Sequence, residues 1–112
     1  MKGQILWTNP NPSSAISTTQ EITLSSSDYD VLEVFYIQVT NSSLCYSSRF
    51  LKGNSTRMRI HATDGTNVYR GITYLSDISY RIDLPYSETT IANINSLAIP
   101  TYIIGYKTGL FS

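Results

Sequence analysis

Apolar and polar residues alternate with a period of two along most of this chain, which is the pattern of strands buried on one face. Ser, Asn, Asp, Gly and Pro cluster between the alternating runs, as turn residues do. About eight short strands, spaced 8–14 residues apart, are typical of a sandwich and not of an α/β fold. We therefore expect residues 1–112 to form one all-β domain, an antiparallel β-sandwich or jelly roll. The predicted strands are 4–8, 16–24, 31–39, 44–51, 57–62, 68–75, 80–84 and 100–106.

The segment 31–39 (VLEVFYIQV) differs from the other runs because both of its faces are largely apolar. A strand of this kind either lies in the middle of a sheet with both faces covered, or presents one face to another subunit. Residues 86–98 show no clear strand pattern, and we expect a long loop or a short helix there.

Composition narrows the class of protein. The chain has 112 residues, 41% of them hydrophobic, which is enough for one small core. Eight basic and eight acidic residues cancel, which argues against a nucleic-acid-binding protein. No apolar run approaches the length of a membrane span, and the first residues lack the apolar stretch of a secretory signal. The single cysteine, Cys45, excludes a framework of internal disulfides, and we expect it to be a small buried residue.

Residues suited to catalysis or metal binding are few. His61 is the only histidine and no serine lies in a nucleophile motif, so a Ser-His-Asp site is not expected. Asp28 with Asp30, or Asp77 with Asp83, could form the carboxylate pair of a glycoside hydrolase, but their positions favour turns and strand surfaces. No acidic loop has the spacing of a dedicated calcium site. We expect neither an enzyme nor a bound metal or cofactor.

The segments 57–62 and 68–75 predict a β-hairpin with Asp64-Gly65 in its turn. If the loop has two or four residues, one hairpin face gathers three arginines, the histidine and a tyrosine, whereas a three-residue loop would break this grouping. Arginine offers forked donors and tyrosine a stacking plane, so this face could hold an anionic or hydroxylated ligand. The alternatives are a solvated sheet face or a contact between subunits. The candidate ligand-binding residues are Arg57, Arg59, His61, Arg70 and Tyr74.

Aromatic residues are more numerous than a core of this size usually needs, with nine tyrosines and one tryptophan, Trp7. Tyrosine combines apolar area with a hydroxyl group, which suits interfaces between subunits. Saccharide recognition also uses aromatic planes with polar neighbours. The aromatic composition therefore fits both an interface and a glycan-binding surface.

Three segments give the chain a family resemblance. It opens with 5–12 (ILWTNPNP), passes through 22–30 (ITLSSSDYD) into the apolar strand 31–39, and closes with 99–107 (IPTYIIGYK). This arrangement resembles modules in the virion appendages of phages and prophages of Gram-positive hosts: tail fibres, baseplate-associated proteins and other minor structural proteins. The resemblance covers most of the chain in outline. Residues 40–95 carry no match, so no ligand-binding position is transferred.

The resemblance implies a β-sandwich, commonly trimeric, that is structural or host-adhesive and not catalytic. We accordingly expect a homotrimer in the virion, assembled in the bacterial cytoplasm, that contacts other virion proteins and host cell-wall polysaccharide. Attachment would be multivalent, because weak sites repeated around a symmetric assembly gain avidity. Two alternatives stay open: a purely architectural protein decorating the capsid or tail, and a cellular carbohydrate-binding module with Trp7 or several tyrosines exposed in a groove. Neither nucleic acid nor membrane insertion is expected.

Overall fold

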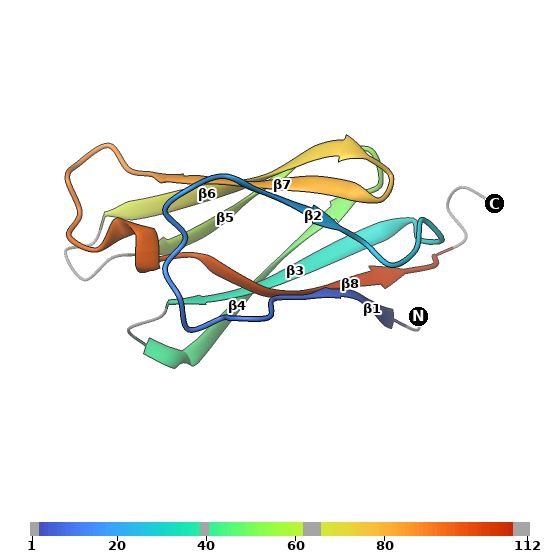
Figure 1. Cartoon of the computed structure of the whole chain (residues 1–112), viewed down its shortest axis with the longest axis horizontal. Helices are drawn as coiled ribbons and strands as arrows, with labels where there is room; N and C mark the ends of the chain where they lie inside the picture. Colours follow the sequence, from blue (N-terminus) through green and yellow to red (C-terminus); the bar gives the residue numbers. More distant parts are fainter. Residues whose placement is uncertain (1–2, 39–40, 62–65, 109–112) are drawn as a thin grey trace.

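The computed structural model describes residues 3–38, 41–61 and 66–108, and their eight strands form two four-stranded antiparallel sheets packed face to face (Figure 1). One sheet has the strand order β1-β8-β3-β4 and the other β2-β7-β6-β5, so the first and last strands are neighbours. The antiparallel β-sandwich expected from the sequence is confirmed. The strands are β1 (Gly3–Thr8), β2 (Gln20–Thr23), β3 (Val31–Gln38), β4 (Asn41–Leu51), β5 (Thr56–His61), β6 (Asn67–Ser76), β7 (Ser79–Tyr86) and β8 (Ile99–Tyr106).

Most of the predicted strands are confirmed to within a few residues at each end. The prediction over 16–24 is too long, because β2 begins only at Gln20 and Ile16 lies buried in the preceding loop. The region 86–98 contains the short 3-10 helix η1 (Ile94–Ser96), and no helix of the described chain is long and apolar enough to cross a membrane. The Asp64-Gly65 turn lies outside the described residues.

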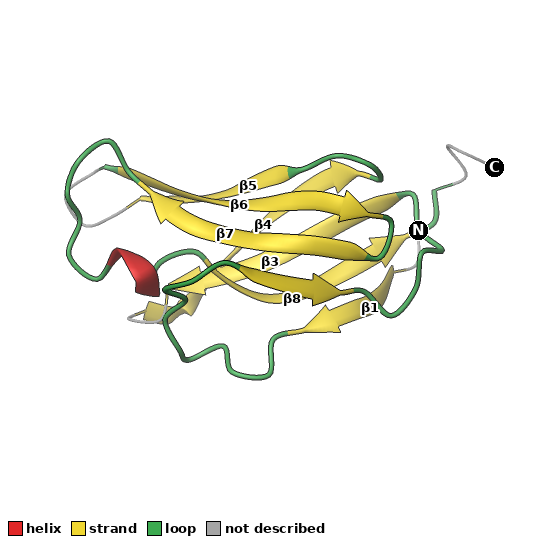
Figure 2. Cartoon of the chain, turned by 45° about the horizontal axis from the view of Figure 1, so that its top comes forward, coloured by secondary structure: helices red, strands yellow, loops and turns green. Residues whose placement is uncertain are grey.

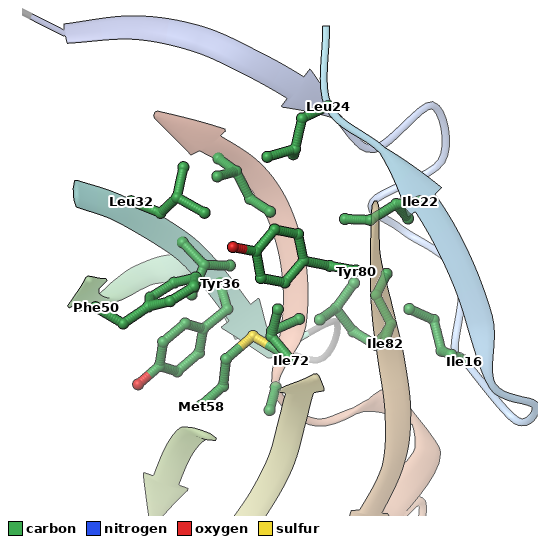
Figure 3. Packing of buried hydrophobic residues seen from close by; sticks show 14 of the residues in the cluster. Ile16, Ile22, Leu24, Leu32, Tyr36, Phe50, Met58, Ile72, Tyr80 and Ile82 are labelled. Carbon is green, nitrogen blue, oxygen red and sulfur yellow. The ribbon is translucent and has the colours of Figure 1, made fainter. Parts of the chain in front are cut away.

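The core lies between the two sheets and consists of their inward-facing side chains (Figure 3). Leu32 and Val34 enter it from β3, and Tyr80 and Ile82 enter it from β7 of the opposite sheet; all four are fully buried. The Tyr80 hydroxyl lies 3.1 Å from the hydroxyl of Tyr29, and burial raises the pKa of Tyr80. Each buried aliphatic side chain contributes about 1.5–3 kcal/mol, so this layer is the main source of stability.

The strand β3 lies between β8 and β4, in the middle of its sheet as one of the two predictions required, but that prediction also needed both faces to be covered. One of its faces enters the core, while no helix or further sheet in the described part of the chain packs on the other (Figure 2). On this second face Phe35 stacks against Tyr102 of β8 with ring centres 4.6 Å apart. Ile5 of β1 extends the same surface and is 57% exposed. We refer to Ile5, Phe35, Tyr102 and Ile104 as the outer apolar face.

A hydrogen-bonded carboxylate adjoins the outer apolar face. Glu33 accepts hydrogen bonds from the hydroxyls of Tyr106 (2.7 Å) and Ser47 (2.8 Å), and the Arg49 guanidinium lies 3.4 Å away. Burial alone would raise the pKa of Glu33, but these hydrogen bonds and the positive charge of Arg49 outweigh burial and lower it. The sheet therefore carries a fixed, ionised carboxylate at neutral pH.

Candidate functional site

Three of the five predicted site residues share one exposed face of the β5–β6 hairpin. These residues, Arg57, Arg59 and His61, alternate along β5 with buried residues. Their side chains therefore point away from the core, and neighbouring ones are about 6.6 Å apart along the strand. The Arg57 guanidinium lies 4.9 Å from the ring centre of Tyr69 on β6. Within the described ranges, neither Arg57 nor Arg59 has a carboxylate at ion-pair distance. We call Arg57, Arg59, His61 and Tyr69 the arginine face; its unpaired cations can bind anionic or hydroxylated groups.

The structure does not place Arg70 and Tyr74 on the arginine face, which corrects the predicted grouping of five residues. His61 pairs with Asn67, so five residues, 62–66, separate the paired ends of the hairpin. This odd number reverses the face of every β6 residue relative to a loop of two or four residues. Arg70 consequently lies opposite the buried Met58 and points into the core.

The Arg70 guanidinium is fully buried and binds only backbone carbonyl groups among the described residues. It donates hydrogen bonds to the carbonyl oxygens of Asp83 (2.9 Å), Asn95 (3.1 Å), Leu97 (3.1 Å) and Ile16 (3.3 Å). Burial lowers the pKa of Arg70 to about 10, so the side chain remains charged at neutral pH. Arg70 thus links the loop that contains Ile16 and the segment that contains Asn95 and Leu97 to β7 by buried hydrogen bonds. Its side chain is not accessible to a ligand at the surface.

Tyr74 lies toward the other end of β6 and supports the turn that follows it. Its hydroxyl donates a 2.8 Å hydrogen bond to the Asp77 carboxylate, and its ring meets that of Tyr80 edge-on with centres 5.6 Å apart. Its backbone N–H donates to the Ser55 hydroxyl at 2.8 Å. Tyr74 therefore contacts the turn and the core, and it does not join Arg57 and Arg59 on the face that the sequence predicted for all three.

The carboxylates that could have formed catalytic pairs are occupied by other groups. The Asp83 carboxylate accepts hydrogen bonds of 2.6 Å from Arg81 and from Thr73, and Asp28 lies 2.8 Å from the Lys107 ammonium. No cluster of three or more metal-ligating side chains occurs in the described chain. These carboxylates stabilise strand and turn surfaces, the role that the sequence favoured for them.

Cys45 is exposed, and the prediction of a buried thiol is wrong. Its neighbour Tyr46 takes the inward position on β4, where its ring stacks on Tyr36 with centres 5.6 Å apart. Because side chains alternate along a strand, Cys45 points to the outside.

A groove follows the open edge of the sandwich, where β1 and β2 border the two sheets. It has a volume of about 480 Å³, and the loop 9–19 forms one of its walls. A register shift between Ile5 and Trp7 places Trp7 opposite the buried Ile103, and the partly buried indole packs against the core and lines the groove. The sequence singled out Trp7 but not the groove, because the groove forms only when the loop 9–19 folds between two edge strands that belong to different sheets.

Comparisons with protein-family models, with curated proteins and with solved structures find no match to this chain. Three surfaces of the sandwich are therefore the basis for assigning a function: the arginine face, the outer apolar face and the groove beside Trp7.

Proposed function

We propose that this chain is a module of a phage virion appendage that assembles as a homotrimer and attaches to the cell-wall polysaccharide of a Gram-positive host. The virion assignment is supported by the resemblance over 5–12, 22–39 and 99–107. These segments contain β1, β3 and β8, which are neighbours in one sheet. The unmatched residues 40–95 supply the arginine face, so the resembling and the unmatched parts of the chain occupy different surfaces.

The uncovered outer apolar face is the observation that carries this proposal. Its four residues all lie in the resembling segments, and the stacked pair of Phe35 and Tyr102 forms its centre. Contiguous apolar surface on a soluble domain marks a contact site, and a domain of this size gains stability by associating. A second copy of the chain is the occupant we propose, with Glu33 as a fixed polar group beside the contact.

The arginine face supplies the proposed contact with the host. Wall polymers carry hydroxyl groups and, in many cases, phosphate groups, and guanidinium groups bind both. A single exposed face of this kind binds weakly. Three copies held in one assembly raise the effective concentration of each site, so the trimer would bind a cell surface far more tightly than one chain does.

The test combines the mass of the protein by light scattering with the binding of fluorescently labelled protein to Gram-positive cells and isolated wall polysaccharides. We expect a trimer at micromolar concentration, and saturable binding to cells of one strain. Phe35→Ser should give a folded monomer that binds cells about 10²-fold more weakly. Tyr86→Ser is the matched control, because Tyr86 is an exposed aromatic residue of the other sheet.

Each part of the proposal has an outcome that contradicts it. A monomeric wild-type protein at micromolar concentration would overturn the trimer. An intact trimer that binds no cell and no wall polysaccharide would overturn adhesion and leave an architectural role in the virion.

A cellular carbohydrate-binding module is the second candidate, favoured by the position of Trp7 in the groove. It differs from the first candidate in needing no assembly. A monomer that binds a polysaccharide with unchanged affinity after Phe35→Ser would support it.

A further inference from the structure

The groove beside Trp7 lies apart from the arginine face. Both strands that border it are edge strands: in the part of the chain that the structure describes, β1 pairs only with β8 and β2 only with β7. The volume of about 480 Å³ is in the range of small-molecule sites, which is roughly 300–1,000 Å³. The arginine face lies on β5 and β6, whereas β2 is at the opposite edge of the same sheet. The two surfaces can therefore bind different ligands.

The indole of Trp7 packs in part against the core and in part lines the groove, so a portion of its ring is open to a ligand. The bulge between Ile5 and Trp7 turns this side chain toward the groove instead of leaving it on the outer surface of β1. Across the described residues, the Trp7 ring has no aromatic or cationic partner and its indole N–H has no hydrogen bond. A half-buried indole with a free N–H combines a stacking surface with a donor.

The loop wall of the groove is held in place by hydrogen bonds. The Asn9 side chain donates to the Pro100 carbonyl at 2.8 Å and accepts from the Asn11 N–H at 2.8 Å. The Ile16 N–H donates to the Asn95 carbonyl at 2.9 Å, and the Ile16 carbonyl accepts from the buried Arg70. A wall fixed in this way does not have to be ordered by a ligand, which lowers the entropy lost on binding.

The polar groups lining the groove are almost all uncharged. Gln20 lies two residues before the buried Ile22 on β2, so the two side chains leave the same face of the strand. The Gln20 amide is exposed, lines the groove and has no hydrogen-bond partner in the described chain. Ser14 and Asn11 add a hydroxyl and an amide from the loop wall. Among the described residues, Glu21 is the one charged residue of the lining, and no basic residue belongs to it. Anionic ligands are disfavoured here, in contrast to the arginine face.

We propose that this groove binds an uncharged saccharide, with one sugar ring stacked on Trp7 and its hydroxyl groups hydrogen-bonded to Gln20 and the loop wall. An aromatic plane surrounded by uncharged donors and acceptors matches a sugar ring, which has an apolar face and a rim of hydroxyls. This assignment rests on the proposed attachment to polysaccharide and deepens it, because it names a site and a ligand charge that the arginine face does not provide.

The sole tryptophan of the chain makes the test direct. Intrinsic fluorescence of the full chain is followed while glucose, galactose, N-acetylglucosamine and neutral polysaccharides of each are added. We expect a saturable blue shift with one sugar type, retained in about 0.5 M NaCl because no ion pair is involved. A response to the polysaccharide but not to the free sugar would identify the polymer as the source of the ligand.

Three variants locate the binding. Gln20→Ala keeps the fluorophore and should bind the sugar about fivefold to tenfold more weakly, through the loss of a hydrogen bond. Trp7→Ala, measured by calorimetry after its fold is checked, should abolish detectable binding. Tyr86→Ser is the control, because Tyr86 is an exposed aromatic residue outside the groove lining, and it should leave the fluorescence titration unchanged.

The outcomes separate this inference from the proposed function. If the protein binds wall polysaccharide while the Trp7 emission stays constant and Gln20→Ala binds as the wild type does, the groove assignment is overturned and adhesion stands. Binding only to anionic polymers, lost in about 0.5 M NaCl, likewise overturns it in favour of the arginine face. If neutral sugars bind at Trp7 but the trimer attaches to no cell, the groove stands and host adhesion is overturned.

Discussion

The hydroxyl group of Tyr36 binds both backbone polar groups of Arg59: it donates to the carbonyl oxygen at 3.0 Å and accepts from the N–H at 3.1 Å. The two residues belong to opposite sheets, Tyr36 to β3 and Arg59 to β5. Because β5 is an edge strand, one side of its backbone has no neighbouring strand. The Tyr36 hydroxyl takes that place at Arg59, and so a core side chain of one sheet fixes the strand that carries the arginine face.

Tyr36→Phe removes this link without changing the packing of the ring. Arg59 then loses a partner for its carbonyl and its N–H, and we expect the free energy of unfolding to fall by about 1 kcal/mol. Urea denaturation measures the loss, and amide hydrogen exchange at Arg59 should become faster. Tyr46→Phe is the control, because Tyr46 stacks on Tyr36 while its hydroxyl has no hydrogen bond within the described chain. Equal destabilisation by the two variants would contradict the role of the bridge.

Arg70 should contribute to the stability of the fold and not to ligand binding. Arg70→Met fills a similar volume but leaves the carbonyl groups of Ile16 and Leu97 without a hydrogen-bond donor among the described residues. Each buried acceptor left unpaired costs about 1–3 kcal/mol, so we expect a loss of about 3 kcal/mol in urea denaturation. Arg59→Met, the same substitution at an exposed position, should stay within about 0.5 kcal/mol of the wild type. A stable, fully folded Arg70→Met protein would show that the carbonyl groups find other donors.

The strand positions could be predicted from the sequence because alternation of apolar and polar residues directly reflects burial. The central place of β3 in its sheet could also be predicted from this pattern, because a strand with two apolar faces is unsuited to the edge of a sheet. The face of Arg70 could not be predicted, because it depends on the length of one loop, and a change of one residue reverses every side chain of β6. The groove was also out of reach, because it depends on how the loop 9–19 lies between two edge strands.

Glu33 should make stability depend on pH in the acid range. Its pKa in the folded protein is lowered, so the stabilisation is complete above the pKa of the unfolded chain, about 4.3. It is lost as the pH falls through the lower pKa of the folded state, because the protonated carboxyl accepts the hydrogen bonds of Tyr106 and Ser47 less strongly and no longer attracts Arg49. Glu33→Gln should therefore destabilise the protein clearly at pH 7 and much less near pH 3.

Thermal unfolding of the wild type and of Glu33→Gln across this pH range measures the difference. Glu88→Gln is the matched control, because Glu88 is exposed and has no ion pair in the described structure. A constant difference between the wild type and Glu33→Gln from pH 7 to pH 3 would mean that the charge of Glu33 does not contribute.

The arginine face predicts binding that depends on salt. Arg57 and Arg59 have no carboxylate partner among the described residues, so their charges are available to an anionic polymer. Arg59→Ala should weaken binding to a phosphate-containing wall polymer about tenfold, the effect of losing one charge-assisted hydrogen bond. Binding by the wild type should also fall as NaCl rises, because exposed charges are screened.

Lys107→Ala removes one exposed positive charge elsewhere and should change the affinity little, which separates a local contact from the effect of net charge. If the two variants weaken binding equally, the arginine face has no specific part in it.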